Sequence, residues 1–343
     1  MTVRGWLGAL AAVGFVLGFG VAAQAGPTLD KVKQAGQISC GVVATGVAGF
    51  GAPDSQGHWA GFNIDICRAL SAAIFGAADK VKYVPLTAQQ RFTALQSGEV
   101  DLLSNNTTDT LQRDTALGLN FAPVVFYDGQ GFMVPKKLGV KGAKELNGAT
   151  ICVQPGTTTE LNLADYFRAN KMEFKPVVIE KLDEALNAFF SGRCDVFTGD
   201  SSALNANRLS QAPNPDDYVI LPERISKEPL APVVRHGDEE WNDIVRWVVY
   251  ALIDAEEKGI TSKNVDDMVK SEDPNIKRML GVTPGAGKAL GLDEKWAYNA
   301  IKLVGNYGEI FDRTLGKDTE LKFDRGLNNL WTHGGLMYAM PIR

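Results

Sequence analysis

The chain has 343 residues, a formal net charge of −5, and a composition that is 45% hydrophobic and 22% charged. This is the composition of an ordinary globular protein, and the length suggests two domains at about 150 residues each. The balance is acidic and there is no basic run or basic-aromatic patch, so nothing in the sequence points to a nucleic-acid partner.

The first 25 residues are typical of a secretory signal peptide. Arg4 precedes an apolar run over 5–21, and Ala23-Gln24-Ala25 then forms a small-x-small cleavage pattern. We therefore expect cleavage after Ala25 and export of the mature chain. The alternative is a membrane anchor, but the apolar run is short for a stable span. No later apolar stretch of the sequence is long enough to cross a bilayer.

The first part of the mature chain alternates between strand and helix patterns. Apolar residues recur at helical spacing in some segments and alternate or form short runs in others. The order is typical of an α/β lobe with a largely parallel sheet. The expected helices are Thr28–Ala35, Phe62–Phe75 and Gln89–Gln96, and the expected strands are Gln37–Val43, Val81–Pro85 and Val100–Ser104.

The same alternation returns farther along the chain. Residues 94–101 and 188–195 match each other: each has a helix end, a glycine stop and an Asp leading into an apolar strand. This repetition favours two lobes of similar build. The expected strands here are Thr150–Val153, Glu173–Val178 and Cys194–Thr198, and the expected helices are Thr158–Ala169, Leu182–Phe190 and Ser201–Leu209.

Two extended crossovers are expected between the lobes. The first covers residues 128–134, and the second covers 226–234, where Pro229 and Pro232 exclude a helix. The predicted division is a signal peptide over 1–25, a first lobe over 26–130 and 232–343, and a second lobe over 131–231. The first lobe then ends in a long extension with helices expected at Trp241–Glu257, Glu294–Val304 and Leu327–Trp331.

Four cysteines remain after export, and four cysteines allow three disulfide pairings. Oxidising conditions outside the cytoplasm permit disulfides. We favour Cys40–Cys67 with Cys152–Cys194 because each pair then stays within one predicted lobe. The alternative is four buried thiols, since cysteine packs well in cores.

No metal or other cofactor is expected. The three histidines, His58, His236 and His333, lie far apart and have no metal-ligand spacing. The sequence also lacks a Cys-x-x-Cys motif. Solvated surface is the simpler interpretation of each histidine.

The first polar constellation is the segment 104–113, which directly follows the third predicted strand. Ligands bind beyond the carboxyl ends of strands in open α/β sheets. Hydroxyls and amides would gather there with Arg113, whose planar fork of donors matches a carboxylate. A polar loop with capping threonines and a solvated Arg explains this segment alone equally well.

The second constellation is the segment 154–160, which follows the first strand of the second lobe and opens a helix. Thr157 and Glu160 fit a capping box, and Gly156 lets the backbone approach a ligand closely. A helix N-terminus offers unpaired N–H groups and a positive dipole end, which suit an anion. The segment is not a Walker A loop, so a carboxylate is a better candidate than a triphosphate. The alternative is a plain helix cap.

The third constellation is Asp200, which lies beyond the last predicted strand of the second lobe. A carboxylate facing a cleft would hold an ammonium group. A zwitterion needs both charges matched, because a charge removed from water without a partner is costly. The alternative is that Asp200 caps the helix that follows.

The order and spacing of several motifs give the chain a family resemblance. These are GFNIDI at 61–66, the segments 104–113 and 156–160, GRCD at 192–195 leading to Asp200, and GGLMYA at 334–339. Together they resemble the polar amino-acid-binding proteins of ABC transporters, solute-binding protein family 3. The general L-amino-acid-binding subfamily is the nearest in pattern.

The resemblance implies the α/β, two-lobed periplasmic-binding-protein type II fold with two crossover hinge strands and a helical C-terminal extension. It also implies that Arg113 pairs with a ligand α-carboxylate, that Thr158 adds an N–H and a hydroxyl to it, and that Asp200 accepts the α-ammonium. The ligand-binding residues it implies are Asn105, Asn106, Thr108, Arg113, Thr157, Thr158 and Asp200.

The side-chain pocket departs from the family pattern. Many relatives have aromatic residues at the positions of Val47 and Ala88. We expect Val47, Phe50 and Ala88 to line a roomier pocket with fewer shape demands. Broad specificity is the hypothesis that follows.

The implied function is a periplasmic receptor that closes on a free L-amino acid by hinge motion and delivers it to the membrane permease of an ABC transporter. The alternative is an enzyme on the same fold, such as a dehydratase acting on a small carboxylic acid. Acid–base catalysis needs a poised titratable group, and no histidine lies near the three constellations. A sensor domain is a third class, but no signalling module follows.

Overall fold

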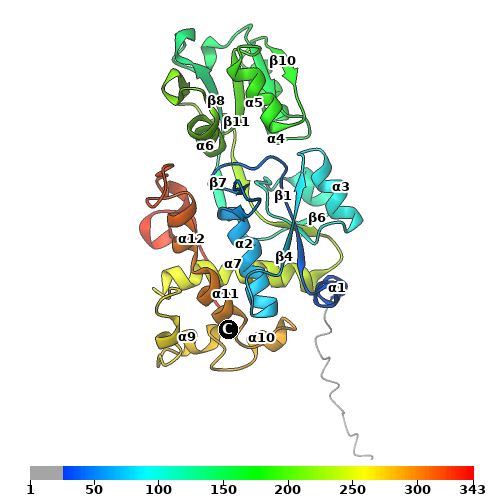
Figure 1. The fold of residues 1–343 in the computed structure, drawn as a ribbon, viewed down its shortest axis with the longest axis vertical. Coiled ribbons are helices and arrows are strands. Elements are labelled where there is room, and N and C mark those ends of the chain that lie inside the picture. The colour runs from blue at the N-terminus through cyan, green and yellow to red at the C-terminus, as the bar shows by residue number, and fades with distance from the viewer. Residues whose placement is uncertain (1–25) are drawn as a thin grey trace, which may run out of the picture.

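The computed structural model describes residues 26–343, so the predicted signal peptide and its cleavage after Ala25 lie outside the described residues. The described chain forms two α/β lobes, one above the other in Figure 1 and joined by extended segments. This is the two-lobed arrangement predicted from the sequence. Within residues 26–343, no helix is long and apolar enough to span a membrane.

Each lobe is built on a five-stranded sheet, and the two sheets share one topology. Their orders are β4-β1-β5-β14-β6 and β10-β9-β11-β8-β12. In both sheets, the first three strands are parallel to one another. The fourth strand follows a crossover and runs antiparallel to its neighbours on both sides, and the fifth strand forms the edge. The first sheet contains β1 (Ile38–Val43), β4 (Val81–Leu86), β5 (Leu102–Leu103), β6 (Leu119–Phe121) and β14 (Val233–Arg235). The second contains β8 (Gln130–Pro135), β9 (Thr150–Val153), β10 (Lys175–Val178), β11 (Val196–Asp200) and β12 (Tyr218–Ile220).

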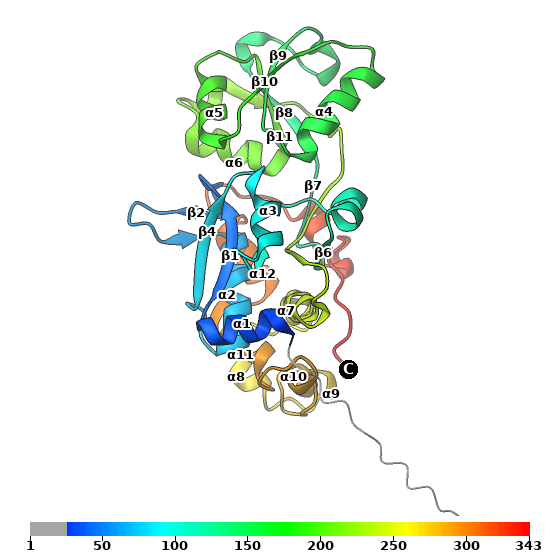
Figure 2. The same cartoon turned by 90° about the vertical axis from the view of Figure 1, so that its right-hand side faces the viewer.

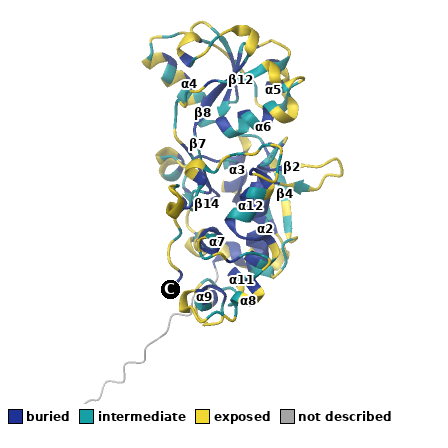
Figure 3. Ribbon diagram, turned by 90° about the vertical axis from the view of Figure 1, so that its left-hand side faces the viewer, coloured by how far each residue is buried: buried dark blue, intermediate teal, exposed yellow. Residues whose placement is uncertain are grey.

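Helices cover both sheets, and their bounds follow the sequence patterns closely. Helix α2 (Phe62–Phe75) is buried along most of its length, including the polar residues Asn63, Asp65 and Ser71 (Figure 3). It ends at Gly76, whose φ of +66° gives the left-handed cap that glycine adopts without a Cβ penalty. The helices are α1 (Pro27–Ala35), α2 (Phe62–Phe75) and α3 (Gln90–Ser97) in the first lobe, and α4 (Thr158–Ala169), α5 (Leu182–Phe190) and α6 (Ser201–Gln211) in the second.

Two short strands connect the lobes. Strands β7 (Phe126–Asp128) and β13 (Glu228–Leu230) pair antiparallel, with Glu228 opposite Asp128. Figure 2 shows β7 where the chain passes from one lobe to the other. A separate hairpin, β2 (Ala52–Pro53) with β3 (Trp59–Ala60), projects from the first lobe in the same view.

The helices of the C-terminal extension pack on the first lobe (Figure 1), while residues 323–328 border a pocket that they share with Ser201, Ser202 and Arg224 of the second lobe. Helix α11 packs against α2 and α7, and α12 packs against the same two helices. The rings of Tyr307 and Phe311 meet Phe62 at centroid distances of 5.7 and 6.4 Å. The helices are α7 (Glu239–Glu257), α8 (Val265–Met268), α9 (Pro274–Met279), α10 (Ala286–Ala289), α11 (Trp296–Val304) and α12 (Tyr307–Thr314).

The helix predicted over Leu327–Trp331 is wrong. Two separate 3₁₀ turns, Gly326–Asn328 and Trp331–His333, stand in its place. Between them Leu330 forms a parallel bridge with Met337, and the N–H of Trp331 donates to the Met337 carbonyl at 3.0 Å. These longer-range bonds replace the helical bonds of a segment too short to propagate a helix alone.

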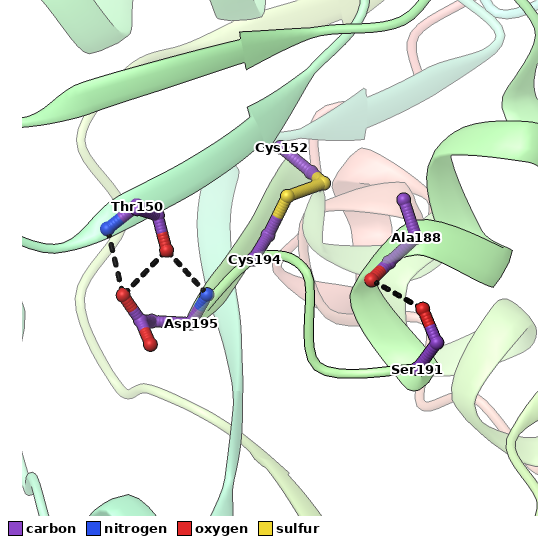
Figure 4. The surroundings of a disulfide bond; sticks show 6 residues. All are labelled: Thr150, Cys152, Ala188, Ser191, Cys194 and Asp195. Carbon is purple, nitrogen blue, oxygen red and sulfur yellow. Dashed lines mark hydrogen bonds between the residues drawn. A yellow bond between two sulfur atoms is a disulfide. The ribbon is translucent and has the colours of Figure 1, made fainter.

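Each lobe contains one disulfide, in the pairing that the sequence favours. Cys40–Cys67 joins β1 to α2, and Cys152–Cys194 joins β9 to the turn before β11. Figure 4 shows the second of these beside Thr150 and Asp195, which are linked by hydrogen bonds. All four cysteines are at most 1% exposed, so both bridges lie inside the cores.

Candidate functional site

A cavity of about 120 Å³ lies between the two lobes. Its walls come from the segments that directly follow the three parallel strands of each sheet. In the first lobe these are Val43–Thr45, Leu86–Ala88 and Asn105–Asn106, and in the second Gln154, Glu180–Leu182 and Gly199–Asp200. The carboxyl ends of both sheets therefore face one space, which is the usual ligand position in open α/β sheets.

The loop after β5 forms the polar wall of the first lobe. Asn105, Asn106 and Thr108 all border the cavity. Asn106 has a φ of +55°, and its side-chain oxygen accepts a bond from the Asn63 amide at 2.6 Å. Thr107 donates to the side-chain oxygen of Asn105 at 2.6 Å. This network holds the loop in a conformation that an isolated polar loop would not keep.

Arg113 lies behind this loop, on one π-helical turn (Gln112–Ala116). It is 7% exposed, does not border the cavity, and donates to the Thr108 carbonyl at 2.8 Å. The alternative of a solvated Arg is therefore wrong. Burial lowers the pKa of Arg113, while Glu228 and Asp200 act in the opposite direction.

Arg91, on α3, is a second buried guanidinium and does border the cavity. Its Nη1 lies 3.4 Å from the Thr107 hydroxyl, and its Nε has no hydrogen-bond partner within residues 26–343. Burial lowers the pKa of Arg91 to about 9, and the nearby charge of Arg113 adds to this effect. The ring of Phe92 lies 4.8 Å from the Arg91 guanidinium and 5.1 Å from that of Arg113. Two cations therefore share one aromatic neighbour beside the cavity.

The second lobe contributes the N-terminus of α4, where Thr157 and Thr158 border the cavity. The Glu160 N–H donates to the Thr157 hydroxyl at 3.1 Å, which forms the predicted cap. The reciprocal half of the capping box differs, because the Glu160 carboxylate accepts from the Gly156 N–H instead. The first N–H groups of a helix have no partner inside the helix, so they remain available to an anion.

Asp200 ends β11 and borders the cavity. It stands at the N-cap of α6, but its side chain makes no capping hydrogen bond. The capping alternative for Asp200 is therefore wrong. Burial raises its pKa well above the usual range, and the carboxylates of Asp128 and Glu228 raise it further, against Arg91 and Arg113. The nearby arginines do not fully offset these effects, so a cationic group bound beside Asp200 would stabilise its ionised form.

The two lobes touch around the cavity. The Thr87 hydroxyl donates to Glu180 at 2.9 Å, and the hydroxyl oxygens of Thr108 and Thr158 lie 3.4 Å apart. A Cβ added to Gly156 would lie 3.2 Å from Cγ of Gln89, so glycine permits this close approach of the lobes. The arrangement is a closed one.

Of the three residues expected to contact the ligand side chain, two border the cavity and one does not. Val47 and Ala88 border the cavity and are small. Phe50 does not; it is 1% exposed and packs edge-on against Phe62 and Phe126, in the core of the first lobe.

Sequence reasoning missed Arg91 and Glu228. Arg91 lies in a predicted helix, and a charged residue in a helix is ordinarily predicted to face solvent. Its position, one turn after a loop at the carboxyl end of a strand, was the available signal. Glu228 lies in the predicted crossover over 226–234, where the prolines predict extended backbone but no pattern predicts a buried carboxylate.

This geometry is matched by known proteins. The family model of the bacterial extracellular solute-binding proteins, family 3, matches residues 40–263.

The chain belongs to this family.

Several solute-binding proteins resemble it over nearly its full length. The general L-amino acid-binding periplasmic protein AapJ of Rhizobium johnstonii is 58% identical over 96% of each chain. The glutamate/glutamine/aspartate/asparagine-binding protein BztA of Rhodobacter capsulatus is 52% identical over the whole of each chain. The structure of a periplasmic binding protein from Brucella ovis, solved with glutathione bound, has a TM-score of 0.89 at 56% identity and covers 92% of this chain and 99% of its own.

These relatives bear on the sequence-based alternative of an enzyme and on the predicted fold. They are binding proteins rather than enzymes, so the dehydratase alternative finds no support. The solute-binding family also agrees with the two-lobed fold. Residues 264–343 lie beyond the part of the chain that the family model matches, although the match to BztA covers the whole chain.

Proposed function

We propose that the protein is the substrate-binding component of an ABC transporter for L-amino acids, with broad specificity. The observation that carries this proposal is the cavity between the lobes, where cationic and anionic side chains meet. Arg91 and Asp200 border the cavity with opposite charges, and Arg113 adds positive charge from behind its wall. A zwitterion satisfies both, whereas a plain anion or cation leaves one of them unmet. The names of AapJ and BztA support amino acids as the ligand class.

In the proposed complex, the α-carboxylate lies toward the guanidinium groups and the N-terminus of α4. Arg113 is the family-type carboxylate partner, and its place behind the loop is secured by the Thr108 carbonyl. Arg91 already borders the cavity and adds a second set of donors for a carboxylate or a side-chain oxygen. The α-ammonium then lies at Asp200, whose ionised form it stabilises.

Binding proceeds by hinge closure in this proposal. A ligand closes the lobes only through contacts that it makes in the closed state alone. Arginine from the first lobe and Thr158 with Asp200 from the second lobe divide those contacts between the two bodies. The proposed lobe boundaries fall at 130/131, one residue inside β8 of the second sheet, and at 231/232, one residue beyond β13.

Export and delivery complete the proposal. Cleavage after Ala25 releases the mature chain into the periplasm, where disulfides form. The closed, loaded protein then docks on the permease subunits of an ABC transporter, the membrane partner of this family. The free L-amino acid is its cargo, and no cofactor takes part.

The broad specificity rests on the side-chain end of the cavity. Val47 and Ala88 present small surfaces there, so few shapes are excluded. The Brucella ovis relative was solved with glutathione, a ligand much larger than a single amino acid. A relative that accepts a ligand of that size agrees with weak shape demands in this branch of the family.

Thermal-shift screening of the mature protein against the twenty amino acids tests the proposal, because a bound ligand raises apparent stability by mass action. Several amino acids should raise the melting temperature, and calorimetry should then give affinities within about tenfold of each other. A single ligand that binds better by orders of magnitude would contradict broad specificity. Failure of all twenty would contradict the amino-acid function itself.

A further inference from the structure

Glu228 is a buried carboxylate at the junction of the two lobes. It is the first residue of the crossover strand β13 and is 1% exposed. It does not border the cavity. A buried charge is costly unless it is fully hydrogen-bonded, so its partners show what it does.

Four side chains donate to this carboxylate, two to each oxygen. Oε2 accepts from the Thr108 hydroxyl at 2.5 Å and from the Thr158 hydroxyl at 2.8 Å. Oε1 accepts from the Asn162 amide at 2.8 Å and from the Ser226 hydroxyl. Thr108 belongs to the first lobe and Thr158 to the second, so one carboxylate oxygen joins hydroxyls from both.

This arrangement fixes the direction of the two threonine hydroxyls. A hydroxyl has one proton to donate and two lone pairs that accept. Because Thr108 and Thr158 give their protons to Glu228, each oxygen has only lone pairs left for other partners. Both residues border the cavity, and their oxygens are 3.4 Å apart. The cavity therefore meets a pair of acceptors here.

Acceptors of this kind suit a cation and repel a carboxylate. Asp200 lies close enough for Glu228 to act on it through space, so negative charge gathers on this part of the wall. The two arginines balance that charge on the other part. An ammonium group has three N–H donors, enough to reach Asp200 and both hydroxyl oxygens.

We propose that Glu228 is a positioning residue that holds the hydroxyls of Thr108 and Thr158 as acceptors, so that the closed site selects ligands carrying an α-ammonium group. This inference rests on the proposed function and deepens it. It also revises the role expected for Thr158, whose backbone N–H stays available to the α-carboxylate while its hydroxyl serves the ammonium.

The test compares L-glutamate with (S)-2-hydroxyglutarate, which has a hydroxyl in place of the ammonium. Affinities are measured by calorimetry, with displacement for the weaker ligand, on the intact mature protein. Glu228→Gln cannot accept from all four donors, so a threonine hydroxyl turns into a donor toward the cavity. L-glutamate affinity should fall about ten- to hundredfold, the range of a hydrogen bond to a charged group, and hydroxyglutarate affinity less than about threefold.

Thr158→Val is the second variant, since a half-buried residue on a helix N-terminus tolerates an isosteric change better than a buried carboxylate does. It should weaken L-glutamate about tenfold or more and hydroxyglutarate much less. If the hydroxyl instead donated to the α-carboxylate, both ligands would lose affinity equally, because both carry that carboxylate. Equal losses would overturn the proposal.

The second lobe offers matched controls. Thr150 donates its hydroxyl to Asp195 (Figure 4) as Thr158 does to Glu228, but neither Thr150 nor Asp195 borders the cavity. Thr150→Val and Asp195→Asn should leave both affinities within about twofold of the wild type. A wild type that binds neither ligand, nor any other amino acid, would refute the proposed function first. A wild type that binds, with unchanged discrimination in the variants, would refute only the role of Glu228.

Discussion

The two lobes share a scaffold but supply opposite halves of the site. In each, an Asp after a helix-ending glycine ties back to the first strand: Asp101 accepts from the Ser39 N–H and Asp195 from the Thr150 N–H, both at 2.8 Å. This is the structural meaning of the repeat between residues 94–101 and 188–195. The two lobes differ where they face the cavity. The first lobe contributes guanidinium groups, and the second contributes a helix N-terminus and a carboxylate. The repeated sequence pattern therefore accounts for the common fold of the lobes, and the different cavity residues account for their different charges.

The largest expected effect concerns the disulfides that the two lobes have in common. Cys40–Cys67 spans 27 residues and Cys152–Cys194 spans 42. Loop-closure entropy then gives stabilisations of about 3.6 and about 3.9 kcal/mol. The double variants C40A/C67A and C152A/C194A should lose nearly equal amounts in denaturant unfolding. A loss confined to one of them would break the equivalence of the lobes.

The next largest effect tests the difference between the walls. Arg113→Ala in the first lobe and Asp200→Asn in the second should each weaken L-amino acid binding by about 2–5 kcal/mol, because each leaves an opposite charge buried without its partner. Calorimetry of both variants measures this. Unchanged affinity in either variant would remove that lobe from the charge match.

A smaller effect is the pH dependence that Asp200 gives to the second lobe. The pKa of Asp200 is raised by burial in the ligand-free state, and a bound ammonium would lower it. Binding therefore releases a proton at pH values below the raised pKa. Affinity should rise with pH, by up to about tenfold per unit, and level off above that pKa.

The same shift acts on stability with the opposite sign. The unfolded carboxyl ionises near its ordinary pKa while the folded one stays protonated, so ligand-free stability should fall as pH rises between the two values. Calorimetry in buffers of different ionisation enthalpy detects the released proton. Asp200→Asn should abolish both dependences, and their persistence in that variant would assign them to another group.

The smallest effect is a difference in stability between the equivalent hydrogen-bonded aspartates, Asp101 and Asp195. Asp101 is 2% exposed and also accepts from Lys31 at 2.8 Å, whereas Asp195 is partly exposed and also accepts from the Thr150 hydroxyl. Asp101→Asn should cost about 2 kcal/mol of unfolding free energy and Asp195→Asn about 1 kcal/mol. Hydrogen bonds with Thr150 lower the pKa of Asp195, so its contribution should disappear as pH falls through that pKa. Equal costs in urea unfolding would show that burial does not distinguish the two aspartates.

Local patterns predicted most of the fold. The bounds of α2, β9, α4 and α5 are those read from periodicity, because each segment follows one period and ends at a glycine, cap or polar turn. The Leu327–Trp331 segment failed because its backbone bonds go to residues farther along the chain. No local pattern encodes that choice.

The site was predictable where its residues follow strands. Asn105, Thr158 and Asp200 border the cavity as expected, since the carboxyl ends of parallel strands meet at one edge. Arg91 and Glu228 depend on tertiary packing: one sits on a helix that happens to face the cleft, and the other on a crossover. The position of Arg91 shortly after the carboxyl end of a strand was a weak local signal, whereas nothing in the residues around Glu228 distinguishes it from a surface charge.

The C-terminal extension anchors the first crossover strand to the first lobe. Asn328 accepts from the Tyr127 N–H at 2.6 Å and donates to the Tyr127 carbonyl at 3.1 Å, and the Tyr307 hydroxyl donates to the Val125 carbonyl at 2.8 Å. The backbone of β7 up to residue 127 is therefore anchored to the first lobe. The next residue, Asp128, instead accepts from the Ser202 N–H of the second lobe at 3.2 Å, so in the proposed hinge motion we expect the torsional change of this crossover to fall between these two anchors.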